Sequence, residues 1–396
     1  MNPYSTSAVV RVLLAGVCAV FAASASTEEE PDSFHRFWPD NLFVADFVSE
    51  HTGFVAGQGG TVLRTTDGGK TWGALYVGKN ELIRRADFVS EKEGWAVGHR
   101  GSIFHTSDAG NSWEVQYEVP DVYLRDVAFA DKNHGWVVGH NATILHTSDG
   151  GASWQKQEMR GFIGRDLPRL HSVYVRDENT AVVVGEFGTV IHTENGGELW
   201  LVTPSEVGVT WLAVDGHGDS IYTVGADGTA AYLTLATDEQ RAEIDRAVAE
   251  AAENAERKAR KKAERRKKKY VPKVVEVLPR ADIEYMVNLV DTGTTEHLFD
   301  VAALPDGSAL VVGRSTVSKL TENGTEPLTP AADVPLAHIW FGGVSVTPSG
   351  TFWAVGIRGL VVRGDTSTMQ FAPAFNLGYS DNITLITNRW TVRNGR

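Results

Sequence analysis

The sequence predicts an all-β protein, a seven-bladed β-propeller with Asp-box-like repeats and one long charged helical insertion in blade five. Two patterns lead to this prediction. An octapeptide recurs at a 41-residue spacing, counted from Asp67 to Asp108 and Asp149. A strand that ends in two apolar residues and a glycine occurs seven times, with its glycines at Gly57, Gly98, Gly139, Gly185, Gly225, Gly313 and Gly356. A period of about 41 residues is that of a four-stranded propeller blade.

The second repeat shows the expected unit of four strands. Its strands are predicted at 82–89, 94–98, 102–106 and from 113 onward, because apolar and polar residues alternate and glycine-rich turns separate the runs. The fourth repeat keeps a weaker octapeptide with Asn195 in place of aspartate, and the last three repeats lose it. We expect all seven blades to persist, since the strand–glycine–turn pattern is retained.

The octapeptide itself is interpreted as a structural turn. Its aspartates should accept backbone N–H bonds as in Asx turns, and its glycines should supply positive φ angles. Its tryptophans should pack between neighbouring blades. The residues concerned are Asp67, Trp72, Asp108, Trp113, Asp149 and Trp154.

The insertion occupies residues 237–280, between a first part of the propeller at 34–236 and the remainder at 281–396. Residues 238–269 contain no glycine or proline and are rich in Ala, Glu, Lys and Arg, which predicts a helix. Acidic residues gather in its first half and basic residues in 257–269, with a thin apolar stripe between Ile244 and Ala263. Two interpretations remain open: a solvated stalk, or a docking arm for a partner protein or an anionic membrane surface.

The chain begins with the features of an export signal, predicted at 1–25. Arg11 precedes a short apolar run, and Ala23-Ser24-Ala25 matches a small-residue cleavage site. We therefore expect an exported, periplasmic protein, with a plastid lumen as the weaker alternative. Cys18, the only cysteine, would be removed with the signal, which leaves no thiol chemistry. The net charge of −13 argues against a nucleic-acid partner.

Closure of the ring is left open by the sequence. Either 34–38 or 382–392 could add an outer strand to a terminal blade, because an open ring would leave exposed strand edges. Residues 283–287 are expected to resume blade five as its outer strand after the insertion.

The octapeptide matches the Asp-box, and over residues 41–365 the chain resembles the Ycf48/Hcf136 family of photosystem II assembly factors. The resemblance implies a non-enzymatic propeller of BNR-like repeats that binds a membrane protein complex or its subunits. A photosynthetic role follows only in a photosynthetic host, and elsewhere the partner could be an envelope transporter. The Asp-box also occurs in sialidases, so it defines architecture better than function.

Partner binding is expected on the face opposite the Asp-boxes, where several arginines surround the propeller axis. Arginine pairs bidentately with carboxylates and phosphates, and aromatic side chains add contact area. Members of the resembled family use an arginine-rich patch for their partner, and Arg84, Arg85 and Arg125 are the nearest positional matches. The alternative is that Asp126, Asp300 and Glu186 neutralise these arginines. The full candidate set is Arg84, Arg85, Arg100, Arg125, Arg169, Trp211, Arg314 and Arg358.

Catalysis is the less favoured interpretation. A sialidase-like glycoside hydrolase could be assembled on paper from Arg85, Asp126, Tyr174 and Glu186, but the sequence lacks the Phe/Tyr-Arg-Ile-Pro signature of that family. Three histidines stand at equivalent third-strand positions: His105, His146 and His192. Equivalent positions on neighbouring blades diverge, so they should not share a metal. We expect no enzyme activity, no metal, no cofactor and a monomer.

Overall fold

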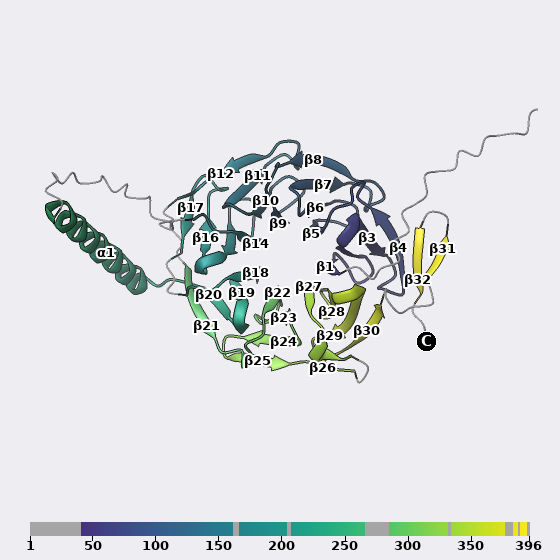
Figure 1. Ribbon diagram of the computed structural model, residues 1–396. Coiled ribbons are helices and arrows are strands. Elements are labelled where there is room, and N and C mark those ends of the chain that lie inside the picture. Colours follow the sequence, from purple (N-terminus) through teal and green to yellow (C-terminus); the bar gives the residue numbers. More distant parts are fainter. Residues whose placement is uncertain are drawn as a thin grey trace, which may run out of the picture. The chain divides into compact units, whose positions relative to one another are not determined.

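Seven separate sheets surround a common axis in the computed structural model (Figure 1). The structure describes residues 41–160, 166–203, 207–265, 285–331, 334–376, 383–386 and 389–393, all within a unit that begins at Trp38. The export signal, and the strand considered at 34–38, lie outside the described residues. The seven-bladed propeller is confirmed.

The first four blades follow the chain in order, each with its innermost strand first. Blade 1 comprises β1 (Leu42–Phe47), β2 (Gly53–Gly57), β3 (Thr61–Thr65) and β4 (Thr71–Tyr76). Blade 2 comprises β5 (Ile83–Phe88), β6 (Gly94–Gly98), β7 (Ser102–Thr106) and β8 (Glu114–Glu118). Blade 3 comprises β9 (Leu124–Phe129), β10 (Gly135–Gly139), β11 (Thr143–Thr147) and β12 (Gln155–Gln157). Blade 4 comprises β14 (Leu170–Val175), β15 (Ala181–Gly185), β16 (Val190–Thr193) and β17 (Trp200–Val202), with β13 (Met159–Arg160) parallel to β17.

The last three blades keep the same order. Blade 5 comprises β18 (Trp211–His217), β19 (Ser220–Gly225), β20 (Ala230–Leu235) and β21 (Tyr285–Val290). Blade 6 comprises β22 (Leu298–Ala303), β23 (Ala309–Gly313), β24 (Thr316–Thr321) and β25 (Gly324–Pro327). Blade 7 comprises β27 (Phe341–Val346), β28 (Thr351–Gly356), β29 (Leu360–Asp365) and β30 (Gln370–Asn376), with β26 (Thr329–Pro330) parallel to β30. Short 3-10 turns are η1 (Gln58–Gly60), η2 (Glu186–Gly188), η3 (Ala226–Gly228), η4 (Leu336–His338) and η5 (Ile357–Gly359).

The glycine that ends each second strand permits a tight corner. A Cβ atom on Gly57 would lie 2.1 Å from the carbonyl oxygen of Asn41, and one on Gly356 would lie 2.0 Å from that of Trp340. The residue after each glycine donates its N–H to the carbonyl oxygen of the residue just before the innermost strand, as His140 does to Tyr123 (2.9 Å). The innermost strand pairs with the second strand at this corner. There, in every blade, its second residue forms a β-bulge. We call this side of the propeller the bulge face.

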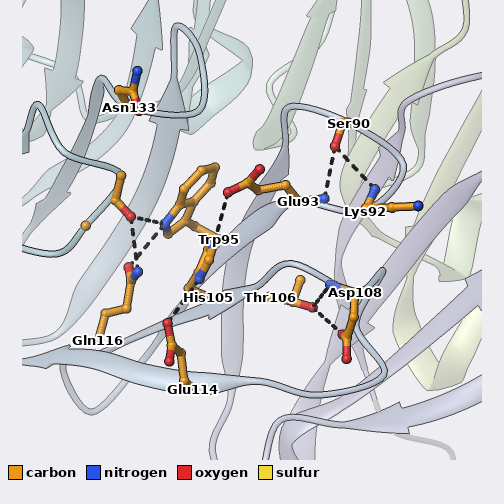
Figure 2. Close-up of polar contacts among 12 residues, drawn as sticks. Ser90, Lys92, Glu93, Trp95, His105, Thr106, Asp108, Glu114, Gln116 and Asn133 are labelled. Atoms are coloured by element: carbon orange, nitrogen blue, oxygen red, sulfur yellow. Dashed lines mark hydrogen bonds and ion pairs between the residues drawn. The ribbon is translucent and has the colours of Figure 1, made fainter.

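The Asp-box turns lie at the other ends of the strands, on the side we call the Asp-box face. Asp108 accepts the backbone N–H and the hydroxyl of Ser112 at 2.8 and 2.7 Å, and the hydroxyl of Thr106 at 2.9 Å. Figure 2 shows the Thr106–Asp108 contacts. Asp67 and Asp149 make the same bonds in their own turns. Each aspartate therefore accepts a backbone N–H within its own turn, as in an Asx-type turn.

Aromatic side chains pack at the interfaces between blades. Trp72 meets Trp353 of blade 7 with ring centroids 5.9 Å apart. Trp113 and Trp154 meet Phe88 and Phe129 of their own blades at 5.9 and 6.0 Å. Those two phenylalanines in turn stack on Phe54 and Trp95 of the preceding blades. The three Asp-box tryptophans belong to apolar clusters that join adjacent blades. The Asp-box tryptophans thus contribute to the apolar contacts between blades, and burial of such rings stabilises these interfaces.

The insertion enters blade 5 between β20 and β21 and contains helix α1 (Asp238–Arg265). Thr237 and Gln240 form a capping box: the Thr237 hydroxyl accepts the Gln240 N–H (3.2 Å), and the Gln240 side chain accepts the Thr237 N–H (2.9 Å). Residues 266–284 lie outside the described residues, as do the side chains of the apolar stripe. Among the described residues, no helix has the length and apolarity needed to cross a membrane.

The end of the chain returns to the first blade. The hairpin of β31 (Ile383–Ile386) and β32 (Arg389–Arg393) extends blade 1, with β32 antiparallel to β4. Of the two segments considered for closure, the C-terminal one supplies the added strands. The edge of β4 is thereby paired rather than left open.

Hydrogen bonds also connect the innermost strands around the whole ring. In every blade, a side-chain oxygen of the innermost strand accepts a backbone N–H from the innermost strand of the next blade, a contact we call an inter-blade latch. The acceptor and donor residues are Asp46 and Phe88, Asp87 and Phe129, Asp126 and Val173, Ser172 and Val214, Asp215 and Ala303, Asp300 and Val344, and Ser345 and Phe47. The last latch closes the ring from blade 7 to blade 1.

Burial makes the ionised form costly for four of the latch carboxyls, among them Asp126, whose pKa it raises against the opposing charge of Arg85. Burial raises the pKa of Asp46 and of Asp215 to about 7. Burial, together with the charge of Asp46, raises the pKa of Asp87 well above its ordinary value. Asp46 and Asp215 are thus partly protonated near neutral pH, because water does not fully solvate their charge.

Replacement of Asp108 should separate the roles of its two oxygens. Asp108→Ala removes every acceptor in the turn, and we expect the free energy of unfolding to fall by about 1–2 kcal/mol. Asp108→Asn should cost less, because Asn195 in the fourth copy already accepts the Leu199 N–H through its Oδ1 atom. Urea unfolding of both variants measures the difference. Equal losses for Ala and Asn would contradict this account of the turn.

Asp215 should make stability depend on pH. Its pKa rises from an ordinary 3.8 to about 7 on folding, so its stabilising contribution is complete below 3.8 and is lost as the pH rises through 7. Asp215→Asn keeps an acceptor for Ala303 and cannot ionise. We expect the variant to gain on the order of 2 kcal/mol over the parent protein between about pH 5 and about pH 8.

Thermal unfolding at the two pH values, with the exposed Asp219→Asn on the same blade as control, measures this gain. An identical shift in both variants would show that the buried latch carboxyl does not titrate as described.

Candidate functional site

The bulge face carries the residues that the sequence singled out as arginine-rich. At the bulge itself, the seven blades place Phe43, Arg84, Arg125, His171, Leu212, Phe299 and Gly342, all of them half-buried around the axis. These residues divide by chemistry. Blades 2 to 4 contribute Arg84, Arg125 and His171, which we call the basic arc. Phe299, Trp340 and Phe43, from blades 6, 7 and 1, form the aromatic arc.

Arg85 follows Arg84 in the sequence, but its side chain forms a buried ion pair inside the ring. Its guanidinium makes two hydrogen bonds to the carboxylate of Asp300, at 2.9 and 2.5 Å, and lies 3.8 Å from Asp126. The contact spans the centre of the ring from blade 2 to blade 6. Burial lowers the pKa of Arg85, but the two carboxylates outweigh it and hold the pKa above its usual value. For Arg85, neutralisation by Asp126 and Asp300 is the interpretation that the structure supports.

Arg84 has no such counter-ion. Its guanidinium lies 5.0 Å from the ring centroid of Phe43, and no hydrogen bond or ion pair joins its side chain to the rest of the described chain. Burial, followed by the charges of Arg125 and Arg85, lowers the pKa of Arg84 to about 10. The positive charge is therefore poorly compensated inside the protein, which favours an anionic ligand at this point.

Arg125 is the second under-compensated cation. Its Nε–H donates to Nε2 of His140 at 3.1 Å, and burial together with Arg169 lowers its pKa. Burial and the nearby arginines lower the pKa of His140 to about 4 and that of His171 to about 3. Both histidines are thus neutral at physiological pH, and the positive charge of the basic arc resides on its arginines.

The remaining arginine candidates are exposed around the rim. Arg169 forms an ion pair with Glu186 at 3.4 Å, and Arg314 pairs with Glu296 at 3.6 Å. The backbone N–H of Arg100 donates to Glu81 (2.6 Å), and that of Arg358 donates to Asn41 (2.9 Å), which leaves both side chains at the surface. All four lie on the bulge face, and Arg169 is near enough to Arg125 for its charge to lower the pKa of Arg125.

Trp211 was wrongly placed on the binding face. Its side chain is 0% exposed and packs in the apolar cluster between blades 4 and 5. It occupies the first position of β18, where other blades place Leu42, Ile83 or Leu298, and this position faces the neighbouring blade rather than the rim. The size of a tryptophan suggested a contact residue, but the repeat position determines its burial.

Two members of the aromatic arc, Phe43 and Phe299, were not among the sequence candidates. Phe43 stacks on Trp340 with centroids 5.5 Å apart, and Phe299 meets Trp340 edge-on at 6.2 Å. Gly342 makes room for this group, since a Cβ atom there would lie 2.9 Å from the Trp340 ring. Repeat alignment could have found Phe43 and Phe299, because they occupy the position of Arg84 and Arg125.

Outside the basic arc, blades 3 and 4 expose three large apolar side chains: Tyr123 (45%), Leu167 (59%) and Phe187 (62%). Tyr123 stacks on His99 at 4.1 Å and meets His140 at 5.0 Å. Phe187 holds a left-handed backbone with φ of 59°, a conformation that costs an aromatic residue about 1 kcal/mol or more. The bulge face thus combines unpaired arginines with exposed aromatic surface.

The residues considered for catalysis do not assemble into one site. Arg85 pairs with Asp300, Glu186 pairs with Arg169, and Tyr174 interacts with Arg176. His105 is held within blade 2 between Glu93 and Glu114 (Figure 2). Across the described residues, no group of three His, Cys, Asp or Glu side chains is placed to bind a metal ion. A groove of about 590 Å³ on the Asp-box face, between blades 3 and 4, is lined mainly by polar residues.

Comparisons with known proteins show which proteins this chain resembles. The fold is a seven-bladed propeller with Asp-box repeats. A family profile described as photosynthesis system II assembly factor YCF48 matches residues 38–120 and 114–227, from blade 1 into blade 5. A search among curated proteins found no match. Over residues 38–227 the chain is therefore similar to the YCF48 family.

Solved structures agree on the fold. "YCF48 bound to D1 peptide" matches with a TM-score of 0.56 and 15% identity over 84% of this chain and 96% of that one. YCF48 from Cyanidioschyzon merolae matches with a TM-score of 0.57 and 16% identity, over 84% and 98% of the two chains. An ancestral GH74 enzyme matches with a TM-score of 0.55 and 12% identity over 91% of this chain, which spans 50% of that structure.

Arg85 and the exposed arginines should respond differently to truncation. Arg85→Met leaves the buried carboxylates of Asp300 and Asp126 without their cation, and we expect the free energy of unfolding to fall by about 3–5 kcal/mol. Arg314→Met removes only a surface pair and should change it by less than about 0.5 kcal/mol. Denaturant unfolding compares them. Similar values for the two variants would contradict the structural role given to Arg85.

Proposed function

We propose that this protein is an exported, non-enzymatic propeller that binds a segment of a membrane protein on its bulge face and aids assembly or stability of that protein's complex. The observation that carries the proposal is the basic arc, in which Arg84 and Arg125 lack carboxylate partners. Tyr123 and Phe187 add exposed aromatic surface to the same face. The Ycf48-like repeats support the proposal, as does the peptide-bound state named for a solved YCF48 structure.

The chemistry of the face suggests the kind of segment bound. A carboxylate would satisfy Arg84 or Arg125 through charge-assisted hydrogen bonds, and apolar side chains of the same segment could cover Tyr123, Leu167 or Phe187. An acidic, partly apolar, extended peptide meets both requirements. In a photosynthetic host the proposed partner is a photosystem II subunit. In another host it is a different envelope membrane complex, such as a transporter.

Neutralising the basic side of this face should weaken partner binding selectively. We expect Arg125→Gln with Arg169→Gln to lower recovery of the membrane-protein partner from native membranes by at least about tenfold, because two charge-assisted contacts are lost. The matched control is Lys92→Gln with Lys132→Gln, two exposed lysines on the Asp-box side of blades 2 and 3.

Recovery is measured by affinity purification and quantitative mass spectrometry, with thermal unfolding to verify the fold. An undiminished partner yield with the arginine variant, or an equal loss with the lysine variant, would exclude the bulge face as the binding surface.

A glycoside hydrolase related to sialidases remains the second candidate, favoured only by the fold likeness to the GH74 enzyme. Turnover of a sialoside or glucan by the purified protein, abolished by Glu186→Gln, would support it over partner binding.

A further inference from the structure

Helix α1 separates its charges along its length. Between Asp238 and Glu256 acidic residues predominate, whereas residues 257–265, which we call the basic half, contain six Lys or Arg and one Glu. The order matches the helix dipole, which favours acids near the N-terminus and bases near the C-terminus. The dipole accounts for the direction of the separation but not for so many cations within nine residues of a chain whose net charge is −13.

The exposed cations of the basic half share one side of the helix. Arg257, Lys261 and Arg265 follow one another at intervals of four residues, and Lys258 and Arg260 flank them. At 3.6 residues per turn these five positions fall within an arc of about 160°, over a length of about 12 Å. All five side chains are exposed. Together they form a strip of positive charge along one side of the helix.

Internal partners neutralise little of this strip. Arg260 lies 3.8 Å from Glu264, with both side chains about two-thirds exposed or more, and Arg257 donates to the side chain of Asn254 at 2.8 Å. Surface pairs of this kind contribute little. Among the described residues, no other ion pair involves the basic half.

The character of the strip selects among anionic partners. The positions opposite it, 255, 259 and 263, are all alanine, so the basic half offers no large apolar anchor of the kind a protein groove grips. The helix contains no aromatic residue on which a base could stack. An array of exposed cations without large apolar or aromatic side chains suits an anionic surface whose charges are spread out and can move sideways, as lipid headgroups do.

We propose that the basic half of α1 binds the anionic headgroups of a lipid bilayer. The contact is electrostatic and superficial, since the basic half contains no apolar residue larger than alanine to insert. It uses residues of the blade 5 insertion and none of the bulge face, so it is independent of the proposed partner site. Its effect is to hold the propeller at a membrane surface, where a membrane-protein segment can be found at raised local concentration.

Sedimentation of the full chain with lipid vesicles tests this proposal. We expect binding to vesicles of phosphatidylcholine mixed with phosphatidylglycerol, and much weaker binding to phosphatidylcholine alone. Arg257→Gln, Lys261→Gln and Arg265→Gln combined should lower partitioning onto the anionic vesicles about 100-fold, at about fivefold per cation. Glutamine preserves helix propensity, so the helix should persist.

The matched control neutralises three exposed acids of the same helix: Glu239→Gln, Glu250→Gln and Glu253→Gln. This control should bind anionic vesicles at least as well as the parent chain. Retention on neutral vesicles measures any contribution of the apolar run 12–21. The proposal is overturned if the parent chain binds both vesicle types equally, or if the basic-half variant binds like the parent. The Arg125/Arg169 variant should retain vesicle binding, which separates this contact from the partner site.

Discussion

The ring of inter-blade latches is the constraint on which the structure depends. Each blade is an independent sheet, so no β-ladder bond passes from one blade's innermost strand to the next. The latches supply that connection with a side-chain oxygen and a backbone N–H, seven times around the axis. Asp46 begins the series and Ser345 closes it onto Phe47. A buried N–H without a partner would cost about 1–3 kcal/mol, so each latch removes a penalty that blade packing alone would incur.

The ring of latches also explains why one arginine near the axis, Arg85, is paired with carboxylates while its neighbour Arg84 is not. Asp126 and Asp300 serve as latches, and their charge within a buried ring requires a cation, which Arg85 provides across the centre. Arg84 sits one residue earlier, at the bulge, where no latch carboxylate pairs with it. The bulge face is therefore cationic at Arg84 and Arg125, even though the interior just beneath it is rich in carboxylates.

Most of the fold could be predicted from the sequence because its signals are local and repeated. The 41-residue spacing of Asp67, Asp108 and Asp149 reports a turn that recurs in each blade, and the glycines report a corner that a Cβ atom would block. The site could be predicted only in part. Arg84 and Arg85 are indistinguishable in sequence, since the partner of Arg85 is 215 residues away and is brought near only by ring closure. Trp211 was misplaced because its chemistry was weighed before its repeat position.

The two basic surfaces of the protein, on the bulge face and on helix α1, differ in their physical character. The basic arc on the bulge face is small, half-buried and bordered by aromatic rings, which suits one specific segment. The basic half of α1 is exposed and lacks anchors, which suits an unspecific anionic surface. A protein that works on membrane complexes would benefit from both, one for specificity and one for location.

The central claim is that the bulge face meets a membrane-protein partner, and site-specific photo-crosslinking in native membranes tests it most directly. A photoreactive residue at position 187 reports on the bulge face, and one at position 132 reports on the Asp-box face. The expected result is an adduct with one integral membrane protein from position 187 alone, lost when Arg125 and Arg169 are neutralised. Equal adducts from both positions, or an adduct from position 132 only, would contradict the account.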